Sequence, residues 1–112
     1  MQGRIMSRNN RVELEADLLT LLAQPTRLKI LYYLKGGERC ACHINPQMQE
    51  DPSVISRHLV KMREAGLLES RKEGVSVYYK IKEPRVFNLL EMVDNIIHTI
   101  AKERADEILR VF

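Results

Sequence analysis

The sequence has few of the features that mark a secreted, membrane-bound or disordered protein. Its 112 residues include only two cysteines, five glycines and four prolines, which argues against a disulfide-stapled scaffold, a collagen-like repeat and a low-complexity chain. No apolar stretch approaches the ~20 residues that cross a bilayer, so no membrane partner is expected. The first ten residues lack the apolar core of a secretory signal, and we therefore expect a cytoplasmic protein.

Motifs typical of enzymes are also missing. The chain has no Cys-x-x-Cys on a βαβ unit, no phosphate-binding glycine loop and no nucleophile paired with a base. We therefore do not expect an enzyme, and no cofactor is obligatory. With 45% hydrophobic and 29% charged residues, the composition is that of a single globular domain, expected over residues 1–112.

The positive charge is concentrated in two segments. The formal net charge is only +3, but residues 53–82 contain seven basic and three acidic residues, and an N-terminal arm over 1–11 contains three arginines. The segments 13–52 and 83–112 are both acidic. A localised basic stretch favours a polyanion as partner, although charge alone is more typical of a solvated surface.

Apolar periodicity predicts helices in the first half of the chain. A broad apolar stripe over residues 12–23 indicates a first helix. Pro25 suits the first position of a second helix, which glycines end at residues 36–37. A third, short element lies between residues 39 and 49, where Pro46 has no amide hydrogen and is expected to interrupt any helix.

A fourth helix has the clearest boundaries. Asp51 is its expected N-cap, and Gly66 is expected to end it. Ile55, Leu59 and Met62 are spaced so that they share one face, which we expect to be buried. His58 lies near the edge of that face, where a packed, hydrogen-bonded histidine is favoured over a histidine that reads bases.

The period changes from helical to alternating after the fourth helix. Apolar and polar residues alternate from Val75 to Ile81, and Lys72-Glu73-Gly74 supplies a turn with a glycine for positive φ. The sequence therefore predicts a β-hairpin over residues 67–81. Arg71 and Lys72 are expected at its tip.

A last helix is predicted over residues 84–110, with a continuous apolar side. It would be ~40 Å long, whereas a compact monomer of this length is roughly 34 Å across. One domain cannot cover such a helix. We therefore expect a homodimer in which the last helix packs against its counterpart, together with the first helix.

This order of elements is typical of a winged helix-turn-helix, in which the capped helix enters the DNA major groove beside the hairpin. Outward-facing polar side chains of that helix can bond base edges and phosphates, and an apolar one can contact a thymine methyl. Basic residues of the hairpin can reach phosphates or the minor groove. A solvated polar face is the alternative. The candidate contacts to double-stranded DNA are Ser53, Ser56, Arg57, Val60, Lys61, Arg71 and Lys72.

Five segments stand out as motifs: residues 22–31 (LAQPTRLKIL), Cys40-Ala41-Cys42, residues 55–59 (ISRHL), residues 63–67 (REAGL), and Glu73-Gly74 with Val77-Tyr78-Tyr79. Together they resemble the motifs of the ArsR/SmtB family of metal-responsive repressors. The resemblance covers about residues 12–110 and implies a mainly α fold with a small β-hairpin, joined as a homodimer through its N- and C-terminal helices. It also implies binding to an inverted-repeat operator and release when an inducer binds.

Cys40 and Cys42 match cysteines that arsenic- and cadmium-sensing members of that family carry. Thiolates are soft ligands suited to As(III), Cd(II), Pb(II) or Zn(II). The sequence departs from those members at Asn45, where the arsenic sensors have a third cysteine, and it lacks cysteines within residues 1–11. His43 is a candidate third ligand. The alternative is that the pair are two small buried side chains beside an exposed histidine.

Asp94 and His98 are weaker candidates for a metal site on the last helix. Family members that sense zinc, nickel or cobalt bind metal on that helix, but with more histidines than this one has. A surface hydrogen bond one turn apart is favoured instead. Three functions stay open: a repressor released by a metal or metalloid, a thiol redox-sensing repressor that uses Cys40 and Cys42, and a winged-helix regulator without a metal inducer, including one that contacts only proteins.

Overall fold

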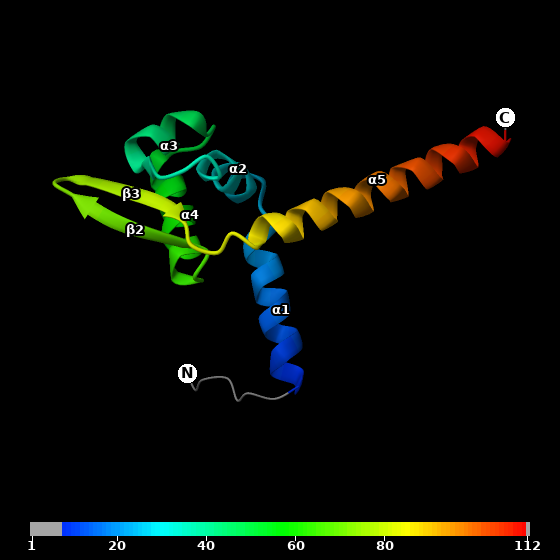
Figure 1. Cartoon of the computed structure of the whole chain (residues 1–112), viewed down its shortest axis with the longest axis horizontal. Helices are drawn as coiled ribbons and strands as arrows, with labels where there is room; N and C mark the ends of the chain where they lie inside the picture. The colour runs from blue at the N-terminus through cyan, green and yellow to red at the C-terminus, as the bar shows by residue number, and fades with distance from the viewer. Residues whose placement is uncertain (1–7, 112) are drawn as a thin grey trace. The chain divides into compact units, whose positions relative to one another are not determined.

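The computed structural model describes residues 8–111, which form a mainly helical chain with a small antiparallel sheet (Figure 1). Contacts divide the chain into two compact units, with the boundary between Lys82 and Glu83. The expected fold class is confirmed. The first unit holds α1 (Arg8–Leu22), α2 (Pro25–Leu34), β1 (Arg39–Cys40), α3 (Ala41–Gln47), α4 (Pro52–Glu64), β2 (Leu68–Glu73) and β3 (Ser76–Ile81), and the second holds α5 (Val86–Val111).

The core of the first unit lies between α2, α3, α4 and the sheet. The predicted inward face of α4 is confirmed, because Ile55, Leu59 and Met62 are at most 1% exposed. Burial of such side chains contributes roughly 1.5–3 kcal/mol each, which fixes the rotation of α4 and leaves its other face in solvent. The remaining buried apolar residues of this unit are Leu22, Ile30, Leu31, Leu34, Cys40, Ile44, Met48, Leu67, Leu68 and Tyr79.

Both ends of α4 follow from local chemistry. At its start, the Asp51 carboxylate accepts a hydrogen bond from the Ser53 amide at 3.1 Å. At its end, Gly66 has a φ of +89°, and the Leu67 amide donates to the Met62 carbonyl at 2.9 Å. A backbone that turns left-handed in this way satisfies the last carbonyls of a helix. The helix predicted to face DNA therefore begins and ends where its own sequence dictates.

Pro46 does not interrupt α3, contrary to the expectation from its missing amide. The helix runs from Ala41 to Gln47 and contains Pro46 one residue before its end. A proline removes the intrahelical bond of its own nitrogen. Because Pro46 lies so close to the end of the helix, few further backbone hydrogen bonds depend on the last turn. The helix α3 therefore tolerates the proline.

The sheet has three strands in the order β1-β3-β2, all antiparallel to their neighbours. The sequence did not predict β1, which pairs Cys40 with Tyr78. The turn is also displaced from the expected Lys72-Glu73-Gly74, because Glu73 pairs with Ser76 and leaves Gly74 and Val75 as the two loop residues. Gly74 supplies the positive φ, at +63°. Arg71 and Lys72 therefore lie within β2 and not at the tip.

The two terminal helices differ slightly from their expected bounds. Residues 8–11, assigned to an N-terminal arm, are already helical in α1, and residues 1–7 lie outside the described part of the chain. The last helix begins at Val86 rather than at residue 84. Among residues 8–111, no helix is long and apolar enough to cross a membrane. Large apolar side chains that stay exposed in a single chain are Val12, Leu14, Leu18 and Leu19 on α1, and Met92, Val93, Ile96, Ile97, Ile100, Ile108, Leu109 and Val111 on α5.

Candidate nucleic-acid interface and thiol pair

The solvent face of α4 carries the predicted DNA contacts. Because the opposite face is fully buried, these side chains have a fixed direction on a capped helix. Val60 is half-buried, so only part of its side chain is free to meet a base. The other four, Ser53, Ser56, Arg57 and Lys61, are exposed.

Ser53 has a second task at the start of α4. Its hydroxyl donates to Asp51 Oδ1 at 3.0 Å, beside the bond that its own amide makes. The backbone hydrogen bond, followed by the hydroxyl bond, lowers the pKa of Asp51, so the capping group is a carboxylate. The Ser53 oxygen keeps its lone pairs as acceptors for an amino group of a base.

His58 connects α4 to α2. Only 7% of the residue is exposed, and its Nδ1 accepts a hydrogen bond from Nε of Arg27 on α2 at 2.9 Å. Arg27 also donates to the Leu21 carbonyl at 3.0 Å, while Glu50 lies 3.7 Å from Nε2 of the histidine. Burial, and then the charge of Arg27, lower the pKa of His58. The predicted packed, hydrogen-bonded histidine is confirmed.

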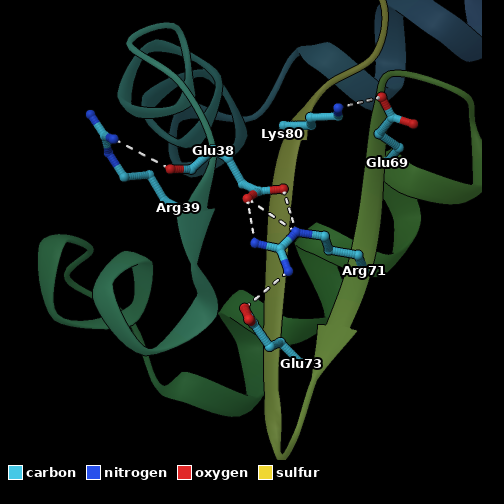
Figure 2. Close-up of polar contacts among 6 residues, drawn as sticks. All are labelled: Glu38, Arg39, Glu69, Arg71, Glu73 and Lys80. Atoms are coloured by element: carbon cyan, nitrogen blue, oxygen red, sulfur yellow. Dashed lines mark hydrogen bonds and ion pairs between the residues drawn. The ribbon is translucent and has the colours of Figure 1, made fainter.

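Arg71 and Lys72 are adjacent in β2 but have different surroundings. Figure 2 shows the Arg71 guanidinium reaching toward Glu38, which precedes β1, and toward Glu73. Arg71 donates to Glu38 at 2.8–3.2 Å and to Glu73 at 3.0 Å, and its guanidinium lies 4.5 Å from the centre of the Tyr78 ring. Lys72 is exposed and has no ion-pair partner within the described part of the chain.

Cys40 and Cys42 are brought together at the start of α3. A disulfide joins them, with their Cα atoms 5.1 Å apart. Cys40 is buried and Cys42 is exposed, and the Cys42 amide donates to Cys40 Sγ at 3.1 Å, so the sulfur of Cys40 caps the helix. The pair is thus joined both to β1 and to α3.

The other predicted metal ligands do not gather into a site. Within residues 8–111, no three His, Cys, Asp or Glu side chains are close enough together to hold a metal ion. His43 is exposed on α3 and does not complete a group with the cysteines. Asp94 and His98 are exposed on α5, and the structure records no hydrogen bond between these two residues.

Residues 24–70 match the family model described as "Bacterial regulatory protein, arsR family". The chain is also 34% identical over 85 residues to an uncharacterised HTH-type transcriptional regulator of Methanocaldococcus jannaschii, which covers 75% of this chain and 96% of that protein. The chain belongs to the ArsR family. Members of this family are DNA-binding regulators, so the expectation that the chain is a regulator and not an enzyme is confirmed.

Two further comparisons bear on the site. The arsenical resistance operon repressor of Escherichia coli is 41% identical over 69 residues, which cover 61% of this chain and 59% of the repressor. A homodimeric winged helix-turn-helix DNA-binding domain from Mycobacterium bovis, a possible ArsR-family regulator, superimposes with a TM-score of 0.70 at 28% identity, over 88% of this chain and 91% of that one.

Sequence reasoning missed the partners of two arginines in this ArsR fold. Arg27 lies in the segment 22–31 (LAQPTRLKIL), but nothing local predicts that it contacts His58, 31 residues later. Glu38 is likewise separated from Arg71 by 33 residues. The only local signal was that each arginine belongs to a predicted helix or strand. The pairing itself depends on how the elements pack.

Proposed function

We propose that this ArsR-family regulator is a homodimeric repressor that binds an inverted-repeat operator in the cytoplasm, with α4 of each subunit in the major groove. One observation carries this proposal. The capped helix α4 presents Arg57, Ser56 and Lys61 to solvent while its other face is buried in the core. A helix held in this way can keep its side chains in register with base edges.

The exposed apolar side of α5 supports the homodimer. Ile97, Ile100 and Ile108 are each more than half exposed in the single chain, and an apolar stripe of this length marks a protein interface. A second copy of the same helix offers the same stripe, as a twofold interface requires. The related domain from Mycobacterium bovis is homodimeric.

The proposed inducer is a thiophilic metal or metalloid such as As(III), bound by Cys40 and Cys42. The fold already brings the two sulfurs together, and the related repressor of Escherichia coli is named for arsenical resistance. Binding requires the reduced pair, because a disulfide has no thiolate to donate. Two sulfurs do not fill a three-coordinate shell, so His43, a water or a small thiol completes it.

A thiol redox switch is the second candidate, favoured by the disulfide that joins the same two residues. In this function the two thiols lose two electrons and two protons to an oxidant such as hydrogen peroxide, which is reduced to two water molecules. The redox function and the metalloid function use the same sulfurs. They differ in which reagent releases the DNA.

The test begins with operator selection from random duplexes by the fully reduced dimer. Gel shifts on the selected duplex are then repeated with As(III), Sb(III), Cd(II), Pb(II) and Zn(II), and separately with hydrogen peroxide. Release by a thiophilic ion in the presence of a reductant supports the metalloid proposal. Release by peroxide alone supports the redox function, and no release by any reagent removes both.

The DNA contacts are tested with two substitutions in the same experiment. Arg57→Ala is expected to weaken binding to the selected duplex and relax its base preference, whereas Lys72→Ala weakens binding to selected and random duplexes alike. A good bidentate contact to a base is worth about 1–3 kcal/mol of discrimination against the wrong base. Equal effects of the two substitutions on both duplexes would contradict the assigned roles.

A further inference from the structure

The hairpin made of β2 and β3, called the wing below, is supported by a third strand over only part of its length. β1 pairs with β3 at Tyr78 and Tyr79 alone. Beyond Tyr78 the wing has two strands as far as its turn, and Figure 1 shows it extending away from the helices of its unit. A two-stranded hairpin is marginally stable by itself. An interaction other than the backbone hydrogen bonds between β2 and β3 must therefore hold the projecting part of the wing at its angle to the rest of the sheet.

Arg71 lies at the last row that has three strands. In this row Cys40 of β1, Tyr78 of β3 and Arg71 of β2 stand side by side. Arg71 is on the outer strand, and its side chain crosses β3, stacks on Tyr78 and reaches Glu38 at the far edge of the sheet (Figure 2). One side chain therefore spans the whole sheet where its support ends.

The charge around Arg71 is unfavourable for a phosphate. Its guanidinium is paired with Glu38 at 2.8 Å and Glu73 at 3.0 Å, and the hydrogen bond from Arg71 is the main cause that lowers the pKa of Glu38. On the same face Lys80 is paired with Glu69 at 3.5 Å. Two basic and three acidic residues thus give this cluster a net negative charge. Lys72 points to the opposite face of β2, away from these carboxylates.

We propose that Arg71 is a positioning residue that clamps the wing to β1 through Glu38, and that it is not one of the phosphate contacts. The proposal rests on the proposed DNA-binding function and refines it. The wing's electrostatic contact with DNA is then made by Lys72. Glu38, which the sequence did not single out, is as important for the wing as Arg71.

Four single substitutions separate the clamp from a phosphate contact: R71Q, E38Q, K72Q and E69Q. K72Q removes one positive charge from the other face of β2. E69Q removes one negative charge from the face of the clamp without touching Arg71. The probe is the duplex selected by the wild-type protein, and affinity is measured over a range of salt concentrations. The active fraction of each variant is fixed by stoichiometric titration, so loss of folding is not mistaken for weak binding.

If Arg71 is a clamp, R71Q and E38Q each weaken DNA binding about two- to fivefold. The slope of log affinity against log salt concentration stays unchanged. The double variant binds no more weakly than either single variant. K72Q lowers the slope by about 0.9 per bound subunit, and E69Q binds as well as the wild type or more tightly. If Arg71 were a phosphate contact, R71Q would lower the slope as K72Q does, and E38Q would free the arginine and tighten binding. Either result, or an E38Q variant that behaves like E69Q, overturns the proposal.

Amide hydrogen exchange gives a second readout that does not depend on DNA. In the clamp, R71Q and E38Q speed exchange at residues 72–77, the projecting part of the wing, whereas E69Q does not. This result is expected even if no duplex is selected, so failure of the proposed function is distinguished from failure of the clamp. Unchanged exchange in both clamp variants would overturn the inference.

Discussion

His58 is the side chain through which α4 is held against α2. Replacing it with Ala removes the acceptor of the Arg27 Nε hydrogen bond and leaves a gap under α4. Loss of the partner of such a group costs about 1–3 kcal/mol. We expect a lower free energy of unfolding by roughly that amount in urea titrations. His98→Ala, on the exposed surface of α5, is the matched control and should leave the free energy of unfolding nearly unchanged.

The same residue makes stability depend on pH. Burial and the charge of Arg27 lower the pKa of His58 in the folded state, so the unfolded chain binds a proton more readily. Its contribution is therefore fully present above the unfolded pKa of about 6.5 and is lost as pH falls through the folded value. We expect the wild-type protein to lose stability over that window, and His58→Gln to lose less. Parallel pH profiles would contradict this assignment.

At the scale of elements, the wing depends on the conformation of one turn residue. Gly74 has a φ of +63°, and a Cβ added there meets no atom within 4 Å, so the penalty of a substitution is conformational and not steric crowding. An L-residue in the left-handed region costs roughly 1–2 kcal/mol. Gly74→Ala should lower the thermal midpoint accordingly. Val75→Ala is the control, because the neighbouring side chain is 100% exposed; an equal loss in the two variants would exclude the conformational cause.

For the whole molecule, the long apolar helix α5 predicts a dimer. Charged substitutions in its apolar stripe should separate the two subunits. Ile97 and Ile100 are 58% and 53% exposed in a single chain. Replacing both with Glu would bury four carboxylates in the interface of two copies, which is strongly unfavourable. We expect monomers in sedimentation equilibrium and no operator binding.

The control for the dimer also introduces two glutamates, but on the other side of α5. Thr99→Glu with Lys102→Glu adds two carboxylates to the exposed polar face of the helix and should leave the dimer intact. A wild-type protein that is monomeric at micromolar concentration would contradict the prediction directly.

The response to an inducer also belongs to the whole molecule. Cys40 joins β1 to α3, and α3 contacts α4, so a ligand on the sulfurs can shift the helix that we propose to face DNA. Allosteric coupling is typically about 1–3 kcal/mol, or 5- to 150-fold in affinity. Cys40→Ser and Cys42→Ser should each still bind the operator but lose release by As(III), while His43→Ala should weaken the response.

A variant with both cysteines replaced by serine tests whether the two sulfurs are the inducer site. If that variant still releases the operator normally with the inducing ion, the sulfurs are not the site. Asp94 and His98 on α5 then become the next residues to substitute. Gel shifts with the wild-type protein on the same duplex provide the reference.

Features that depend on neighbours along the chain were predictable from the sequence. The bounds of α4 were predictable because Asp51 and Gly66 act on backbone groups within a few residues, and its buried face followed from the spacing of Ile55, Leu59 and Met62. The alternation of residues 75–81 likewise indicated the hairpin. Even there the turn was misplaced, because register depends on which residues pair across the strands.

Contacts between distant segments were not predictable, because they depend on how the folded chain packs. β1 has only two residues, too few to show an alternating apolar pattern. It is a strand because it pairs with the edge of β3. The sequence predicts Arg71 as a DNA contact because a basic residue in a hairpin has no visible partner there. Folding brings Glu38 to it across the sheet, and the nearest opposite charge, not the composition of the segment, determines what a charged side chain is free to bind.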